Sequence, residues 1–351
     1  MKKNLAALAI PLFFSIGLAA SSARADEHGN PALTVGSGPA LPFATLPAGA
    51  TGPEGLTVGE DGNVYVTTFG FNATGAASGN GQLFVFGDDG DLLRQVNIQG
   101  STVHLLGLAF HPTTHALLVI DFGAGKVLTV DPFSGASSVF MTVTGSPGLN
   151  ALTFDKGGNV YVSDSFQGII WKTGPGGGSG TAWVSDPLLT TKGFPPFGAN
   201  GVEFNNAGDA LFVANTGDDT IIRIPVAGGT PGTPAVFVQA INGADGIAID
   251  KQDNIWVAAN QSDQIVVVNS TGKLLAKLGR FEGLTGNGTP RGLLFPASPA
   301  FSKDGKVLYV SNLALDVRLA GVPSQSPDTQ WTDLVKRYTV SKIRTDFSGQ
   351  D

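Results

Sequence analysis

Four oxygen-bearing side chains occupy one repeated position in this sequence. Each stands directly before a small residue and an aliphatic residue, as in Glu54-Gly55-Leu56, at the start of a strand-like segment. The four residues are Glu54, Asn150, Asn200 and Asp245. Two carboxylates and two amide carbonyls are hard oxygen donors, which suit Ca²⁺, Mg²⁺ or Mn²⁺ and leave coordination positions for water or substrate oxygens. The pattern predicts a divalent-cation site, with Ca²⁺ as the expected ion and Mg²⁺, Mn²⁺ or Zn²⁺ as alternatives.

Two further copies of the segment carry apolar residues at this position, Leu106 and Ala297. The alternative to a cation site is that the polar side chains only cap strand ends through backbone hydrogen bonds. That interpretation suits a single asparagine better than four donors in one column. The cation site is therefore the favoured interpretation.

A second column of polar residues ends the following strand in every copy. Its members are Thr68, Asp121, Asp164, Asn215, Asn260 and Asn312. Asp and Asn are common at turns because their side chains satisfy nearby backbone groups. A feature shared by all copies is better explained by the repeat than by a site, so we assign this column to structure. Asn215 and Asn260 are kept as candidates for contact with a substrate.

These columns belong to a repeat of about 45 residues, each copy pairing an apolar strand with a β-branched or aromatic one across a turn. The paired strands lie within residues 53–68, 107–121, 150–164, 200–215, 245–260 and 298–312. Two more strand-like runs separate successive copies, and no segment shows a helical period. We predict an all-β protein, a six-bladed β-propeller with four antiparallel strands per blade, in preference to an open β-solenoid.

In a propeller the first strand of each blade lines the central channel, so the four donors are expected to meet at one depth. The ring must also close. The run Val335–Ile343 alternates in polarity and is expected to be the outer strand of the last blade, with a contribution from Ala32–Leu46.

Composition excludes several classes of function. The chain of 351 residues has no cysteine, which excludes thiol nucleophiles, thiolate zinc sites and iron–sulfur clusters. Its net charge is −7 and it has no basic cluster, so we expect no nucleic-acid partner. Neither a G-x-S-x-G nucleophile motif nor a phosphate-binding loop is present.

Residues 1–25 have the pattern of a cleavable bacterial signal peptide. Lys2 and Lys3 precede the apolar stretch Leu5–Ala20, and Ala23-Arg24-Ala25 offers a cleavage site before Asp26. An N-terminal membrane anchor is the alternative, but the apolar stretch is short and no stop-transfer segment follows it. We expect residues 26–351 to form a single periplasmic or secreted domain without a membrane span.

The segments around the four donors resemble the senescence marker protein / gluconolactonase / luciferin-regenerating-enzyme family and the related paraoxonase and strictosidine-synthase-like propellers. The closest stretches are NGVEFNNAGDALFVANT, Asn200–Thr216, and ADGIAIDKQDNIWVAAN, Ala244–Asn260. In that family a glutamate, two asparagines and an aspartate hold a divalent cation in the channel. The resemblance implies a metal-dependent lactonase or esterase in which Asp245 is also the general base that takes a proton from water.

The sequence departs from the family at two substrate-binding positions. The paraoxonase type begins its second blade with a histidine, where Leu106 stands here. His104, two residues earlier and on the same strand face, is a candidate to replace it. The arginine with which gluconolactonases grip a polyol has no clear counterpart, and Arg291 is the candidate substitute. Both departures concern the substrate more than the metal.

An exported, metal-dependent hydrolase of lactones or related esters is therefore the favoured function. The alternative is a non-enzymatic propeller, similar to NHL-repeat proteins, that binds a protein, peptide or glycan and holds a structural metal. Propellers host unrelated functions, so the fold alone does not decide between the two. A protein partner is not excluded by the sequence.

Overall fold

The computed structural model describes residues 38–322 and 328–346. By its internal contacts the chain divides into Met1–Thr34 and Val35–Asp351, and every described residue belongs to the second unit. The expected signal peptide, residues 1–25, lies outside the described residues. Within the described part, no helix is both long enough and apolar enough to cross a membrane.

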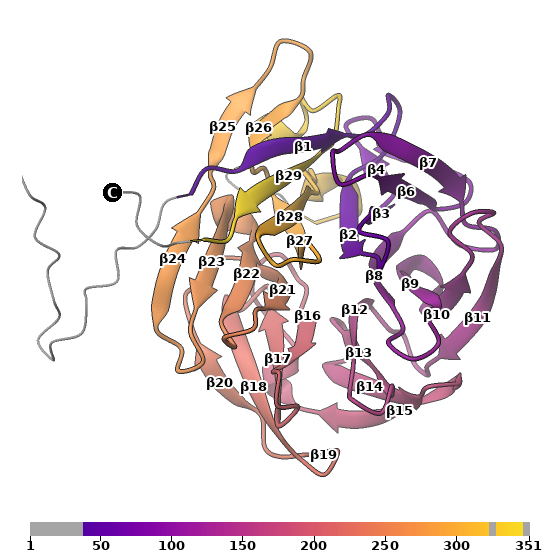
Figure 1. Ribbon diagram of the computed structural model, residues 1–351, viewed down its shortest axis with the longest axis vertical. Helices are drawn as coiled ribbons and strands as arrows, with labels where there is room; N and C mark the ends of the chain where they lie inside the picture. Colours follow the sequence, from indigo (N-terminus) through magenta and orange to yellow (C-terminus); the bar gives the residue numbers. More distant parts are fainter. Residues whose placement is uncertain (1–37, 323–327, 347–351) are drawn as a thin grey trace, which may run out of the picture. The chain divides into compact units, whose positions relative to one another are not determined.

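The second unit consists almost entirely of antiparallel β-strands (Figure 1). One sheet contains β2 (Pro53–Val58), β3 (Val64–Thr68), β6 (Gln82–Phe86) and β7 (Leu92–Asn97). Another contains β21 (Ala244–Ile249), β22 (Ile255–Ala259), β23 (Gln264–Val268) and β24 (Leu274–Leu278). A third contains β16 (Ala199–Phe204), β17 (Ala210–Asn215), β18 (Thr220–Ala227), β19 (Thr230–Pro231) and β20 (Ala235–Val238).

An eight-stranded sheet combines two antiparallel sets of strands. The first set is β8 (Leu105–Phe110), β9 (Leu117–Asp121), β10 (Lys126–Val130) and β11 (Ser137–Thr142). The second set is β12 (Leu149–Phe154), β13 (Val160–Asp164), β14 (Ile169–Gly174) and β15 (Gly177–Ser185). A short parallel pairing of β11 with β15, at Met141 and Thr142, joins the two sets at their outer edges.

Short elements complete the described chain. Two hairpins are β4 (Phe71–Asn72) with β5 (Gly75–Ala76), and β25 (Phe281–Leu284) with β26 (Pro290–Gly292). The helical turns are η1 (Phe122–Ala124), η2 (Pro187–Leu189), η3 (Asn260–Ser262), η4 (Val317–Ala320) and α1 (Thr329–Thr332). None of these helices exceeds four residues, so strands carry the architecture.

The first strands of successive strand sets pack against one another in a closed cycle. β2 contacts β8, β8 contacts β12 and β12 contacts β16, and the series continues through β21 and β27 back to β2. Figure 1 shows these strands around the centre of the unit, with the later strands farther out. The prediction of an all-β, propeller-like architecture is therefore confirmed.

Glycine after the donor position permits the close approach of these first strands. A Cβ atom on Gly55 would lie 2.2 Å from the carbonyl oxygen of Leu106 on β8. A Cβ atom on Gly201 would lie 2.5 Å from the carbonyl oxygen of Asp245 on β21. Any side chain at these two positions would push adjacent strands apart. The repeated glycine is thus a packing requirement.

The second strand of most sets forms the densest part of the core. β3, β9, β13 and β22 are buried along their whole length. On β13 the Tyr161 ring packs edge-on against Phe204 of the neighbouring sheet, with ring centroids 4.9 Å apart. A strand buried on both faces must be apolar on both, which explains continuous runs such as Val160-Tyr161-Val162.

The two ends of the described chain meet in the remaining sheet. Its order is β1 (Leu41–Thr45), β29 (Thr339–Arg344), β28 (Val307–Asn312) and β27 (Pro296–Phe301). The expectation that the C-terminal run is the outer strand is wrong, because β29 is third and β1 is outermost. Burial accounts for this order: β29 buries Val340 and Ile343, whereas three of the five residues of β1 are exposed.

Candidate functional site

Each of the four predicted donors is the second residue of the first strand in its set, on β2, β12, β16 or β21. In all four the pairing with the next strand shifts around the donor. On β2 the shift falls between Pro53, opposite Thr68, and Leu56, opposite Val66. The corresponding shifts on the other strands surround Asn150, Asn200 and Asp245. Such a bulge bends the strand and redirects side chains beside it.

The four donors line one small cavity and are almost fully buried. Exposure is 4% for Glu54, Asn150 and Asp245 and 5% for Asn200. The cavity has a volume of about 40 Å³, which leaves room for an ion or about one water molecule. The structure therefore brings the predicted donors together near the N-terminal ends of their strands.

Hydroxyl groups fix the orientation of the two asparagine amides. Asn200 Nδ2 donates to Thr216 Oγ1 at 3.0 Å, and Asn150 Nδ2 donates to Ser165 Oγ at 3.4 Å. Because each amide nitrogen is engaged in this way, the carbonyl oxygen is the end that remains for a ligand. Both asparagines therefore present acceptor atoms to the cavity.

The same hydroxyl groups tie neighbouring strands together. Thr216 Oγ1 donates to the Ala244 carbonyl at 2.8 Å, and Ser165 Oγ donates to the Ala199 carbonyl at 2.7 Å. Ala244 and Ala199 directly precede Asp245 and Asn200 along the chain. A single hydroxyl thus orients one donor and anchors the strand that carries the next.

Each of the two carboxylates has one buried oxygen without a hydrogen-bond partner among the described residues. These atoms are Glu54 Oε2 and Asp245 Oδ1. The other oxygen of Asp245, Oδ2, accepts a hydrogen bond from Asn260 Nδ2 at 2.9 Å. A buried carboxylate oxygen without a donor costs free energy unless it is protonated or bound to a cation.

Electrostatics also favour a cation between these groups. Burial raises the pKa of the Glu54 carboxyl well above its ordinary value, and the nearby Asp245 charge raises it further. Burial likewise raises the pKa of Asp245. No lysine, arginine or histidine is among the residues that line the cavity. A bound divalent cation would supply the missing positive charge and favour both ionised forms.

The donor set fits a hard cation better than a transition metal. Among the described residues, no group of three or more His, Cys, Asp or Glu side chains converges on a point. The four predicted donors in the lining are instead two carboxylates and two amides, and each can present an oxygen atom to an ion. Such a set suits Ca²⁺ or Mg²⁺, whereas the preferred ligands of zinc include imidazole and thiolate.

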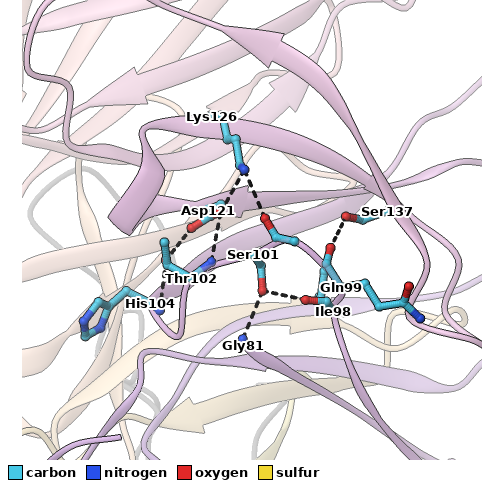
Figure 2. Close-up of polar contacts among 10 residues, drawn as sticks. Gly81, Ile98, Gln99, Ser101, Thr102, His104, Asp121, Lys126 and Ser137 are labelled. Atoms are coloured by element: carbon cyan, nitrogen blue, oxygen red, sulfur yellow. Dashed lines mark hydrogen bonds and ion pairs between the residues drawn. The ribbon is translucent and has the colours of Figure 1, made fainter. Parts of the chain in front are cut away.

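His104 lies beside the mouth of the cavity and is not part of its lining. Its Nδ1 donates to the Phe69 carbonyl at 2.7 Å, and its ring stacks on Phe71 with centroids 4.9 Å apart. Its backbone N–H donates to Thr102 Oγ1, which in turn donates to Asp121 (Figure 2). Phe69, which holds the imidazole, does line the cavity, so His104 is one residue removed from the donors.

The structural assignment of the strand-end column fits Asp121. Its Oδ2 accepts the Thr102 N–H at 3.1 Å and lies 3.6 Å from Lys126 Nζ (Figure 2). Asn215 is similarly engaged, because its Nδ2 donates to the carbonyls of Leu188 and Thr190. These side chains hold loops to the ends of the strands.

Of the two asparagines predicted to contact a substrate, only one lines the cavity. Asn260 lines the cavity and bonds to Asp245, whereas Asn215 does not line it. Arg291 is also outside the lining: it lies exposed on the β25–β26 hairpin, where its guanidinium donates to the Glu282 carbonyl at 2.7 Å. The structure thus places Asn260 alone of these three at the site.

Sequence reasoning missed the supporting hydroxyls and most of the apolar lining. Ser165 and Thr216 each follow directly after a member of the strand-end column, in Asp164-Ser165 and Asn215-Thr216, and this recurring dipeptide was a usable signal. Part of the apolar lining follows the repeat as well, because Leu106 stands in the donor column and Phe69 and Leu313 occupy the position of Ser165 and Thr216. The other apolar members come from segments outside the aligned positions, which the alignment of copies does not reveal. The members of the apolar lining are Phe69, Leu106, Pro195, Phe197, Phe295, Leu313, Leu315 and Val317.

Comparison with known families gives two partial matches. The model of the SMP-30/gluconolactonase/LRE-like region matches residues 189–279, which include Asn200 and Asp245. The strictosidine synthase-like, N-terminal model matches residues 40–69, which include Glu54. No curated protein matches the chain in sequence. The resemblance predicted from the segments around the donors is therefore confirmed.

Solved structures show the same fold over most of the chain. A luciferin-regenerating enzyme is 15% identical, with a TM-score of 0.60 over 84% of this chain and 92% of the other. The calcium-binding protein regucalcin from Agrobacterium tumefaciens is 16% identical, with a TM-score of 0.59 over 88% and 95%. A gluconolactonase from Xanthomonas campestris is 15% identical, with a TM-score of 0.56 over 79% and 95%. The chain therefore resembles the SMP-30/gluconolactonase/LRE-like proteins in sequence over residues 189–279 and shares its fold with these three proteins.

Proposed function

We propose that this protein is a hydrolase of lactones or related esters that depends on a divalent cation, with Ca²⁺ as the expected ion. The observation that carries the proposal is the pair of unpartnered oxygens, Glu54 Oε2 and Asp245 Oδ1, in one cavity with two asparagine carbonyls. The match to the gluconolactonase-like family model supports a lactonase-type reaction.

The chain's own residues suit the two tasks of ester hydrolysis. Glu54, Asn150, Asn200 and Asp245 would hold the cation, which would polarise the substrate carbonyl. Asp245 would accept the proton of the water that attacks this carbonyl, while Asn260 keeps its Oδ2 in place. Cleavage of the ring C–O bond, with the proton passing from Asp245 to the leaving alkoxide oxygen, would then yield a hydroxy acid. The surrounding apolar side chains limit access of bulk water.

The architecture that we infer for this function is a six-bladed propeller with four antiparallel strands per blade. The closed contact series through β2, β8, β12, β16, β21 and β27 supports this count. We further propose that residues 1–25 direct export, so that the domain of residues 26–351 acts in the periplasm or medium. The proposed hydrolase activity does not depend on the number of blades or on export.

Removal of the cation or of the carboxylate charges tests the hypothesis. Purified protein should hydrolyse members of a lactone panel in the presence of Ca²⁺ and lose this activity with a chelator. Asp245→Asn and Glu54→Gln should each lower kcat/KM by about 100-fold or more, because they remove the base or a cation ligand. Glu60→Gln is the matched control, since Glu60 is an exposed glutamate far from the lining.

The result that would contradict the hypothesis is lactone hydrolysis that persists in chelator and in both variants. A second candidate function, a binding propeller with a structural cation, is favoured by the small cavity of about 40 Å³. That function predicts a large Ca²⁺-dependent rise in melting temperature without turnover of any lactone or ester in the panel.

A further inference from the structure

A continuous set of phenyl rings lies beside the candidate cation site. Phe69, which lines the cavity, contacts Phe122 with ring centroids 5.6 Å apart. Phe122 contacts Phe197 at 6.4 Å and Phe166 at 5.6 Å, and these last two are 5.7 Å apart. The rings come from four separate loops of the chain. We call Phe69, Phe122, Phe166 and Phe197 the aromatic rim.

The aromatic rim is accessible at its outer part. Phe166 is 51% exposed, and Phe122 and Phe197 are half-buried. Exposed phenyl rings that cluster beside a cavity leave apolar surface in water, which costs free energy unless a ligand covers it. Because Phe197 also lines the cavity, this surface is continuous with the position of the donors.

Aliphatic side chains complete the lining on other segments. Leu313, Leu315 and Val317 follow β28, and all three are buried. Phe295, which precedes β27, adds a further ring that is 2% exposed. The apolar surface therefore extends around the donors from several sides.

Groups that bind polyols are scarce at this mouth. The lining contains no basic side chain, and its two further polar members, Thr216 and Asn260, already bond to neighbours of the site. Arg318 lies next to Val317, but its guanidinium is held by Asp316 at 2.6 Å. A sugar lactone would lose hydrogen bonds to water on this surface without gaining replacements.

The size of the cavity separates the substrate into two parts. The cavity that the donors share with Phe69 and Phe197 is small, about 40 Å³, so its inner end suits a carbonyl group better than a substituted ring. The remainder of a larger substrate would then lie toward the mouth, against Phe197 and the rest of the aromatic rim. An apolar substituent would bury surface there, whereas hydroxyl groups would be desolvated.

We propose that the substrates are lactones or esters with an alkyl or aryl substituent, and that the aromatic rim binds this substituent. The inference rests on the proposed hydrolase function and specifies its substrate class. It places the reacting carbonyl at Glu54 and Asp245 and the substituent on Phe166 and Phe197.

The test compares δ-decalactone and dihydrocoumarin with glucono-δ-lactone and unsubstituted δ-valerolactone. We expect kcat/KM for the two apolar lactones to exceed that for glucono-δ-lactone by at least about tenfold. Phe166→Ala and Phe197→Ser should each lower the ratio of kcat/KM for δ-decalactone to kcat/KM for δ-valerolactone by about tenfold, mainly through KM for δ-decalactone. Because Phe166 is exposed, its variant keeps the core intact.

Phe133→Ala is the matched control. Phe133 is 69% exposed and lies under the Arg94 guanidinium at the β10–β11 turn, apart from the aromatic rim. Hydrolysis of glucono-δ-lactone as efficient as that of δ-decalactone would overturn the inference and leave the proposed function standing. So would equal effects of Phe133→Ala and Phe166→Ala on δ-decalactone.

If no lactone or ester is hydrolysed, the proposed function fails and binding decides the inference. The probe is then δ-decanolactam, which keeps the ring, carbonyl and pentyl chain but resists hydrolysis. Calorimetry should show binding to the Ca²⁺-loaded protein that Phe166→Ala weakens and Phe133→Ala does not. Absence of binding to the wild-type protein would overturn the inference.

Discussion

Asn260 connects the strand-end column to the candidate cation site. Its Nδ2 donates to Asp245 Oδ2, and its Oδ1 accepts from Gln261 Nε2 at 3.0 Å. This chain of contacts fixes one oxygen of Asp245 and leaves the other at the cavity. Asn215, the equivalent residue in the preceding repeat, bonds to backbone carbonyls instead. Equivalent positions in the repeat therefore have different roles: Asn260 orients a predicted cation ligand, and Asn215 holds a loop.

This difference predicts opposite outcomes for two matched substitutions. Asn260→Ala should weaken Ca²⁺ binding by about 10- to 100-fold, because residues that orient metal ligands commonly contribute this much. Asn215→Ala should lower the melting temperature, since the Leu188 and Thr190 carbonyls lose a donor, yet change Ca²⁺ affinity by less than about twofold. Calorimetric titration and thermal melts measure the two effects. Equal loss of Ca²⁺ affinity in both variants would contradict the distinction.

The donor residues could be predicted from the sequence because they recur at one position of the repeat. Their partners were harder to predict. The bond from Thr216 to the Ala244 carbonyl depends on how closely two strands approach, which no spacing within one repeat records. In the aromatic rim, Phe69 and Phe122 share one repeat position, directly after Thr68 and Asp121, whereas Phe166 and Phe197 stand at positions that do not recur, so their approach to the other two rings depends on the fold.

At the scale of elements, an aspartate organises the turn between the first two strands in several sets. Asp250 accepts the N–H groups of Gln252 and Asn254, each at 2.9 Å, and the Trp256 Nε1–H at 3.0 Å. Asp155 accepts the corresponding groups of its own turn, with Tyr161 as the aromatic partner. One carboxylate thereby links the turn to the buried second strand.

Asp250→Ala should destabilise the β21–β22 turn. Several hydrogen bonds to a charged acceptor are lost together, so we expect the free energy of unfolding to fall by about 2 kcal/mol. Trp256 is 1% exposed and would lose this acceptor, so its fluorescence should report the change. Asp88→Ala, at an exposed position of the β6–β7 turn, is the control. Unchanged stability of the Asp250 variant would refute this role.

The paired strands of each repeat could be predicted from alternating polarity and turn residues, and the structure contains these antiparallel pairs. Two features of strand order could not. The parallel contact of β11 with β15 involves two residue pairs between glycine-rich and polar segments, which carry no periodic signal. The position of β29 between β28 and β1 depends on which of the two strands, β29 or β1, is the more buried in the folded molecule.

For the molecule as a whole, buried carboxyl groups couple stability to pH. Burial raises the pKa of Glu54, Asp245, Asp263 and Asp328, and a neighbouring carboxylate raises those of Glu54 and Asp263 further. In the unfolded chain these groups titrate near pH 4. The folded protein therefore binds more protons, so the stability present below about pH 4 is lost as pH rises through the raised values.

We therefore expect the melting temperature of chelator-treated protein to fall between about pH 5 and about pH 8. Added Ca²⁺ should restore part of the loss, with a gain that grows over the same interval because the ion binds the ionised forms of Glu54 and Asp245. Asp263→Asn should reduce the pH slope in chelator without altering the Ca²⁺ gain. A Ca²⁺ gain that is constant with pH would contradict this linkage.

The pairing of β1 with β29 determines the order in which the molecule is assembled. Leu41, near the start of the described chain, lies opposite Lys342, near its end. The entropy lost on joining two distant residues grows slowly, by about 0.6 kcal/mol for each doubling of the loop, so the long separation costs little stability. It does affect timing, because synthesis delivers β1 before the strands β2 to β28 and delivers β29 after them. Until Thr339–Arg344 is available, β1 lacks the strand with which it pairs, so completion of this sheet is a late event in folding.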